Sequence, residues 1–158
     1  MLYKNILLGT DGTKLMSKVY EHCAYLALLS NATVHIVNII DNSVYAAMPI
    51  EGTLPGYTFA PTNASWATVY DVLRETGKKI TENAKKDLVS LGVSENEIKV
   101  TVLEGHPARE LLSYAETHLI DLVIIGTHGR TGIDKLLIGG IADKIIRSSK
   151  VPVLVVRS

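Results

Sequence analysis

The residues whose types and spacing point most directly to chemistry lie between positions 122 and 142. An apolar run at 122–125 leads straight into a glycine-rich loop at 126–132, and a second glycine pair opens a predicted helix over 141–149. Glycine lets the backbone approach a ligand closely, and the free N–H groups in the first turn of a helix attract anions. This stretch therefore predicts a phosphate-binding site.

Three further loops follow apolar runs earlier in the chain. They are residues 9–13 (Gly-Thr-Asp-Gly-Thr), Asp41, and residues 105–107 (Gly-His-Pro). In an open parallel sheet, ligands bind beyond the carboxyl ends of the strands. We therefore expect all four loops to gather at one edge of a sheet.

The elements that must position these loops alternate along the chain. Strand-like apolar runs and amphipathic helical segments, the longest at 66–91, predict five strands and four helices. Right-handed crossovers arrange such a chain as a parallel sheet with helices on both faces. We therefore predict an α/β fold with a single domain over residues 1–158, and a Rossmann-like open parallel five-stranded sheet of strand order 3-2-1-4-5.

One segment, at about 42–64, breaks this regularity with prolines and glycines among aromatic residues. Loops of this length are usually functional or disordered. Both a mobile insertion and a lid or partner surface fit its composition.

Composition narrows the class of partner. The 16 basic and 16 acidic residues cancel, so the long-range field that draws proteins to nucleic acid or anionic membranes is missing. Cys23 is the only cysteine, the N-terminus does not resemble a signal peptide, and the histidines lack the spacing of metal ligands. We expect a soluble cytoplasmic protein with no metal site, no nucleic-acid partner and no membrane association.

The glycine spacing matches neither G-x-x-x-x-G-K-[ST] nor G-x-G-x-x-G. Together with residues 7–13 and the apolar run 151–156, it resembles the universal stress protein family over nearly the whole chain. Members of that family that bind ATP carry G-x2-G-x9-G-[ST]. This chain has Gly126, Gly129 and Gly139 at that spacing, but Gly140 where the hydroxyl residue is expected.

The resemblance implies a regulatory protein that binds ATP, with or without Mg²⁺, and hydrolyses it slowly at most. It implies that Asp11 contacts the ribose or phosphates and that Ile39 covers the adenine. The full set of implied nucleotide contacts is Gly9, Thr10, Asp11, Ile39, Ile40, Gly105, Gly126, Thr127, His128, Gly129, Arg130, Gly139, Gly140, Ile141 and Ala142. Efficient phosphoryl transfer needs a phosphate-gripping lysine, which these loops do not offer.

Structural explanations remain open for several of these residues. Asp11 also suits a turn or a helix N-cap, and the glycines also suit tight turns and close packing. Arg130 suits either a phosphate partner or a solvated loop charge, and His106 suits a helix cap. A missing hydroxyl at Gly140 costs about ten- to a hundredfold in affinity, because a hydrogen bond to a charged group is worth about 1.5–3 kcal/mol.

Two other functions compete with nucleotide binding. A dimeric interaction module of the same fold, without a nucleotide, is favoured by Gly140. An enzyme similar to adenine-nucleotide α-hydrolases is disfavoured, because the Ser-Gly-Gly-rich first loop of that class is not present in residues 9–12.

The last apolar run, 151–156, predicts how the protein assembles. We expect it to form a strand at an edge of the sheet, where its backbone groups are unpaired and too apolar to be left in water. Pairing with its own copy about a two-fold axis satisfies these groups. The sequence therefore predicts a homodimer built on residues 151–157, and dimers in the family that it resembles often use this strand.

Overall fold

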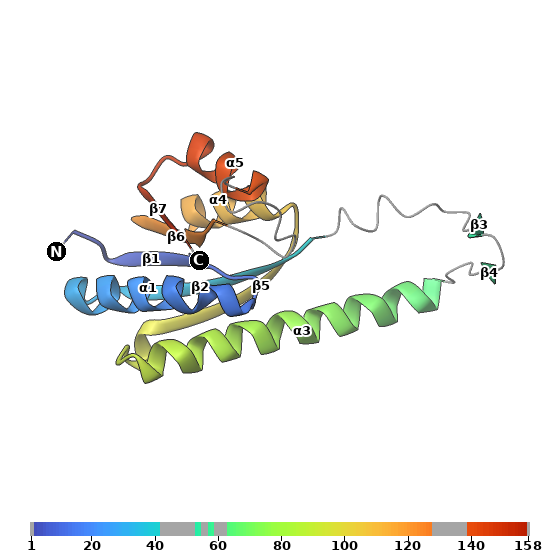
Figure 1. Cartoon of the computed structure of the whole chain (residues 1–158), viewed down its shortest axis with the longest axis horizontal. Coiled ribbons are helices and arrows are strands. Elements are labelled where there is room, and N and C mark those ends of the chain that lie inside the picture. Colours follow the sequence, from blue (N-terminus) through green and yellow to red (C-terminus); the bar gives the residue numbers. More distant parts are fainter. Residues whose placement is uncertain (1, 42–52, 55–56, 59–62, 128–138, 158) are drawn as a thin grey trace.

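The computed structural model describes residues 2–41, 53–54, 57–58, 63–127 and 139–157 of the chain. Its main sheet contains five parallel strands: β1 (Asn5–Gly9), β2 (Thr33–Asp41), β5 (Ile98–Gly105), β6 (Leu122–Gly126) and β7 (Val153–Val156). Their order in the sheet is β5-β2-β1-β6-β7 (Figure 1). Counted along the chain, this order is 3-2-1-4-5, so the predicted fold class is confirmed.

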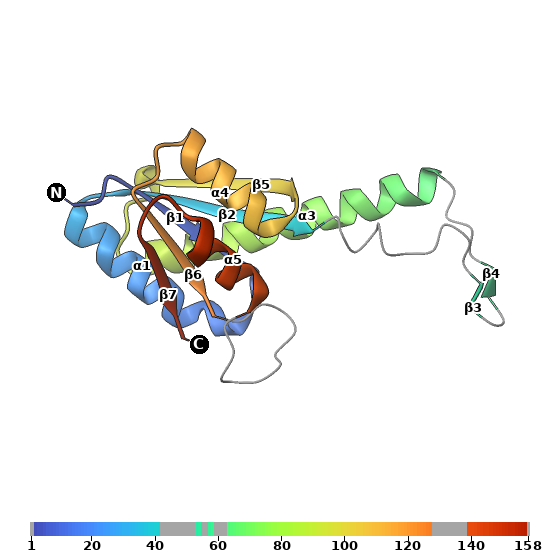
Figure 2. The same cartoon turned by 90° about the horizontal axis from the view of Figure 1, so that it is seen from above.

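Helices cover both faces of the sheet. The helices α1 (Ser17–Ser30) and α3 (Asn63–Ser90) lie on one face, and α4 (Pro107–Thr117) and α5 (Gly140–Ser148) lie on the other, as Figures 1 and 2 show. Each face has its own buried cluster, and successive residues of a strand belong to different clusters. Leu8 belongs to the first with Leu88 of α3, and Leu7 belongs to the second with Ile145 of α5. Burial on both faces explains why the neighbouring strands β1 and β6 read as continuous apolar runs.

The longest helix, α3, is held by an apolar stripe. Ala84 and Leu88 are 1% and 0% exposed against the sheet. The helix stops before Gly92, whose φ of +99° belongs to the left-handed region that favours glycine, and the N–H of Val93 closes the end by donating to the Leu88 carbonyl. The N-terminal part of α3 extends beyond the end of the sheet (Figures 1 and 2).

The segment predicted to be irregular contains regular structure. A two-stranded antiparallel hairpin, β3 (Thr53–Leu54) and β4 (Tyr57–Thr58), lies within it, and α3 already begins at Asn63. Strands of two residues are too short to produce a visible alternation of apolar and polar side chains, so the sequence did not predict them.

The other boundaries differ from prediction by a few residues. The last strand begins at Val153 instead of residue 151, although the Pro152 carbonyl already accepts from the Val123 N–H at 3.0 Å. Its place at the edge of the sheet is confirmed. Over the described ranges, no helix combines the length and the apolar character needed to cross a bilayer.

Candidate functional site

The strand ends bring the predicted loops to one edge of the sheet. The strands β1 and β6 are neighbours at the centre, with Leu8 opposite Ile124, so Thr10 and Gly126 come at the same level two residues later. The chain leaves β1 for α1 on one face and leaves β6 for α5 on the other. Such a switch point opens a crevice beyond the strand ends, which is where open α/β sheets bind ligands.

The loop after β1 is anchored through Thr10, which is 7% exposed. Its N–H donates to the Val37 carbonyl at 3.0 Å, and its Oγ1 lies 2.6 Å from the Tyr20 hydroxyl and accepts from the Gly12 N–H at 3.2 Å. Its carbonyl accepts from Nδ2 of Asn38 at 2.8 Å. The side chain of Thr10 is therefore bonded within the fold.

Burial raises the pKa of the Tyr20 phenol above its usual value of 10.0. The hydrogen bond with Thr10 opposes this rise, and the negative charges of Asp87 and Asp11 add to it. The phenol consequently keeps its proton throughout the neutral range and can hydrogen-bond to Thr10 as a neutral group.

Asp11 forms a turn in the loop after β1. Its Oδ1 accepts from the Thr13 N–H at 2.9 Å, which closes an Asx turn, so the turn role left open by the sequence is confirmed. Because a carboxylate has about four acceptor positions, this bond leaves capacity for ligand hydroxyl groups. Gly12 follows at φ +72°, and a Cβ there would lie 2.7 Å from Cγ1 of Ile80 in α3, so this position requires glycine.

The predicted phosphate loop is tied together at its two ends. The Thr127 carbonyl accepts from the Gly139 N–H at 2.9 Å, and the Thr127 N–H donates to the Val156 carbonyl of β7 at 3.1 Å. A Cβ on Gly139 would lie 3.1 Å from the Thr127 carbonyl oxygen, so glycine permits this close approach. Three of the predicted contacts, His128, Gly129 and Arg130, lie outside the described residues.

The helix α5 begins at this closure. Gly139 is its N-cap and accepts from the Asp143 N–H at 2.9 Å, which leaves Gly140, Ile141 and Ala142 in the first turn, where backbone N–H groups have no partner within the helix. Gly140 is exposed, and no described atom lies within 4 Å of the Cβ that it lacks. The missing hydroxyl could therefore be added without a clash.

Asp143 introduces a charge that the sequence analysis missed. It lies in the first turn of α5, where its carboxylate would repel a phosphate, but Nε of Arg147 holds it at 2.9 Å. The ion pair directs this negative charge toward the next helical turn.

Three further predicted contacts come from β2 and β5. Ile39 is half-buried and packs against the cluster beneath α4 and α5, whereas Ile40 is 6% exposed. Gly105 has φ +141°, and a Cβ there would lie 2.6 Å from Oε1 of Glu110. Backbone shape and packing therefore suffice to explain Gly105 as a glycine. His106 is the N-cap of α4, but its side chain makes no capping hydrogen bond.

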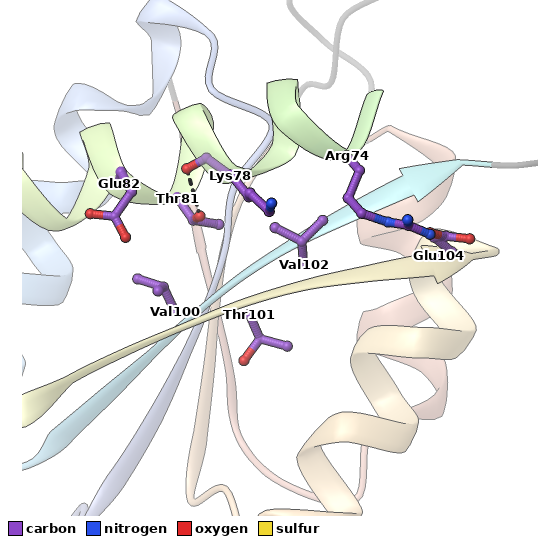
Figure 3. Close-up of a pocket in the computed structure, with 8 residues that line it drawn as sticks. All are labelled: Arg74, Lys78, Thr81, Glu82, Val100, Thr101, Val102 and Glu104. Atoms are coloured by element: carbon purple, nitrogen blue, oxygen red, sulfur yellow. Dashed lines mark hydrogen bonds and ion pairs between the residues drawn. The ribbon is translucent and has the colours of Figure 1, made fainter. Parts of the chain in front are cut away.

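A separate groove opens at the outer edge of the sheet, between α3 and β5 (Figure 3). Its volume is about 370 Å³, and it is lined by Val100 and Val102 on the strand and by Lys78 on the helix. At its rim, the guanidinium of Arg74 forms an ion pair with Oε1 of Glu104 at 2.6 Å. No residue of the predicted contact set lines this groove. In the described part of the chain, no group of three or more His, Cys, Asp and Glu side chains comes together as a metal site.

Cys23 does not contribute to chemistry. It is fully buried, and burial raises the pKa of its thiol to about 12, so the nucleophilic thiolate is not available at neutral pH. Cys23 packs in the buried cluster beneath α1 and α3 as a small hydrophobic side chain.

Comparisons with known proteins agree over the length of the chain. The model of the universal stress protein family matches residues 2–157. The universal stress protein MJ0531 of Methanocaldococcus jannaschii is 32% identical over 156 residues, which are 99% of this chain and 83% of the relative. The universal stress protein YxiE of Bacillus subtilis is 27% identical over 156 residues, 99% of this chain and all of the relative.

Solved structures share the fold. The structure of protein MJ0577 superposes with a TM-score of 0.80 at 26% identity, covering 100% of this chain and 98% of that one. A universal stress protein in complex with cAMP gives a TM-score of 0.67 at 21% identity, covering 99% and 98%. A universal stress protein of Archaeoglobus fulgidus in complex with dAMP gives 0.63 at 16% identity, covering 98% of each chain.

Proposed function

The chain belongs to the universal stress protein family, and from this premise we propose that it binds an adenine nucleotide, with ATP as its main ligand. The site is the crevice between the Thr10–Thr13 loop and the start of α5. The observation that carries the proposal is the Thr127–Gly139 closure, which brings the first turn of α5 to the switch point of the sheet. Helix N-termini at such points are suited to phosphate.

The phosphate end depends on backbone donors. The N–H groups of Gly140, Ile141 and Ala142 approach the phosphates, and Arg130 adds a charge-assisted donor. Asp11 accepts from the ribose hydroxyls, and Ile39 covers the adenine. Two proteins of the same fold hold cAMP and dAMP, which supports an adenine nucleotide as the ligand class.

The protein acts as a regulator in a stress response, with hydrolysis slow at most. Phosphoryl transfer requires a positioned base and groups that grip the γ-phosphate. Of the acidic residues near the crevice, Asp11 has one oxygen committed to the Asx turn. Mg²⁺ that enters with ATP would therefore be held mainly by the phosphates of the nucleotide.

The second candidate is an interaction module of the same fold that holds no nucleotide. Gly140 favours it, because the hydroxyl of the family motif is missing and nothing in the described surroundings replaces it. In either case we propose a homodimer through residues 151–157. The position of β7 at the sheet edge supports this interface.

Thermal unfolding with ATP, ADP, AMP, cAMP and GTP tests the proposal. A ligand at a hundred times its Kd adds about 2.7 kcal/mol to the free energy of unfolding. Adenine nucleotides should raise the melting temperature and GTP should not. An unchanged melting temperature with every nucleotide would support the interaction module, and rapid conversion of ATP to AMP and pyrophosphate would support the enzyme similar to α-hydrolases.

A further inference from the structure

Two buried polar side chains, absent from the predicted contact set, hold the loop after β1. Tyr20 of α1 and Asn38 of β2 are each 6% exposed and reach Thr10 from different elements. The hydroxyl of Tyr20 lies 2.6 Å from Oγ1 of Thr10, and Nδ2 of Asn38 donates to its carbonyl at 2.8 Å. The side chain and the carbonyl of Thr10 are thus both fixed from within the fold.

The helix α3 presses on the same loop. A Cβ on Gly77 would lie 2.8 Å from Cγ1 of Val102 and 2.9 Å from Oδ1 of Asn38, so the absence of a side chain lets the helix approach both β5 and this amide. One turn along, Ile80 occupies the space beside Gly12, where a Cβ would lie 2.7 Å from its Cγ1. The loop is therefore enclosed by α1, β2 and α3.

Hydrogen bonds within the fold hold the shape of the loop. The N–H groups of Thr10, Gly12 and Thr13 donate to the Val37 carbonyl, Oγ1 of Thr10 and Oδ1 of Asp11 respectively. A loop that is already ordered does not lose conformational entropy when it binds, which improves affinity. Phenylalanine would fill the site of Tyr20 among its apolar neighbours with no need of a partner, so the phenol is explained by the bond to Thr10.

We propose that Tyr20 and Asn38 are positioning residues that hold the Thr10–Thr13 loop in its binding shape, with the Thr10 hydroxyl as their anchor and not as a ligand contact. The inference rests on the proposed binding of an adenine nucleotide. It divides the loop into an internal part, Thr10, and a part that faces the ligand, Asp11.

The first test is a set of matched variants whose ATP affinity is measured by calorimetry. Tyr20→Phe and Asn38→Leu should each weaken ATP binding about three- to tenfold, since each removes one internal hydrogen bond. Gly77→Ala, whose added Cβ crowds Asn38 and Val102, should weaken binding in the same direction. Tyr25→Phe and Thr76→Ala, exposed positions on α1 and α3, are the controls and should leave the affinity unchanged.

A double-mutant cycle distinguishes an anchor from a ligand contact. If Thr10 acts through Tyr20, then Tyr20→Phe should have no further effect on ATP affinity in a Thr10→Val background. Additive losses would mean that the Thr10 hydroxyl contacts the nucleotide, and would overturn the inference. Lower melting temperatures with unchanged affinity in both single variants would also overturn it, because the bonds would then be merely structural.

Amide hydrogen exchange of the nucleotide-free protein separates this inference from the proposed function. Tyr20→Phe and Asn38→Leu should speed exchange at the N–H groups of Gly12 and Thr13 relative to amides in β1, and Tyr25→Phe should not. If the wild-type protein binds no nucleotide, the proposed function fails. Faster exchange in the variants would still show that Tyr20 and Asn38 hold the loop. Unchanged exchange at these amides in both variants would overturn the inference, whatever the protein binds.

Discussion

A buried histidine should make this protein lose stability in mild acid. His35 of β2 is 2% exposed; its Nδ1 lies 3.0 Å from the Tyr114 hydroxyl, and its Nε2 has no hydrogen-bond partner in the described part of the chain. Its ring meets those of Tyr114 and His118 edge-on, at 5.8 and 5.9 Å between centroids. Lys99 is its partner in the β2–β5 register.

These surroundings disfavour a charged imidazole. Burial is the main cause, followed by the positive charges of Lys99 and His118, and together they lower the pKa of His35 from 6.5 to about 4. The unfolded chain therefore binds more protons than the folded one between these two values. Stability that is fully present above pH 6.5 is lost as the pH falls toward 4. At 1.36 kcal/mol for each pKa unit, the loss amounts to about 3 kcal/mol.

The assay compares urea unfolding of the wild-type protein and His35→Gln between pH 7.5 and pH 4. Glutamine can still hydrogen-bond to Tyr114 but does not titrate, and other titrating groups contribute to both proteins alike. The drop in unfolding free energy should be smaller in His35→Gln by about 2–3 kcal/mol. His22→Gln, at an exposed position on α1, is the control and should follow the wild type. Parallel profiles for wild type and His35→Gln would refute the reasoning.

Four further predictions concern the site, the assembly and one strained residue. Gly140→Ser should tighten ATP binding by about 0.5–2 kcal/mol in calorimetry, because the hydroxyl adds a bond to phosphate in open space, and an unchanged or weaker affinity would contradict this. Asp11→Asn should alter ATP affinity while the melting temperature of the empty protein stays nearly constant, because the amide oxygen can still close the Asx turn, whereas Asp11→Ala should lower both. Leu154→Lys should convert the dimer to a monomer in light scattering while Gly140→Ser leaves it intact, and a wild-type monomer at micromolar concentration would count against the interface. Leu119→Gly should raise the free energy of unfolding by about 0.5–1 kcal/mol, because Leu119 has φ +52° and is 78% exposed, and Leu119→Ala, which keeps a Cβ, should not.

The sequence by itself determined the architecture. Strands and helices have different apolar periods, and right-handed crossovers arrange strict alternation as a parallel sheet with helices on both faces, so the fold class could be predicted. The same alternation predicted that the loops after the strands gather at one edge of the sheet. The sequence did not predict the strands β3 and β4, because two residues per strand carry no periodic signal.

Only the tertiary structure decided what individual polar groups do. A sequence pattern indicates which face a residue lies on, but not which distant atom takes its hydrogen bond. The hydroxyl of Thr10 hydrogen-bonds to the hydroxyl of Tyr20. The carbonyl of Thr10 accepts from Nδ2 of Asn38, which is 28 residues away along the chain. Gly105 is fixed by its backbone angle and by Glu110, and the pKa of His35 is lowered mainly by the depth of burial and further by Lys99 on another strand. These properties depend on contacts between segments that are remote in sequence, and such contacts exist only once the sheet and its helices have packed.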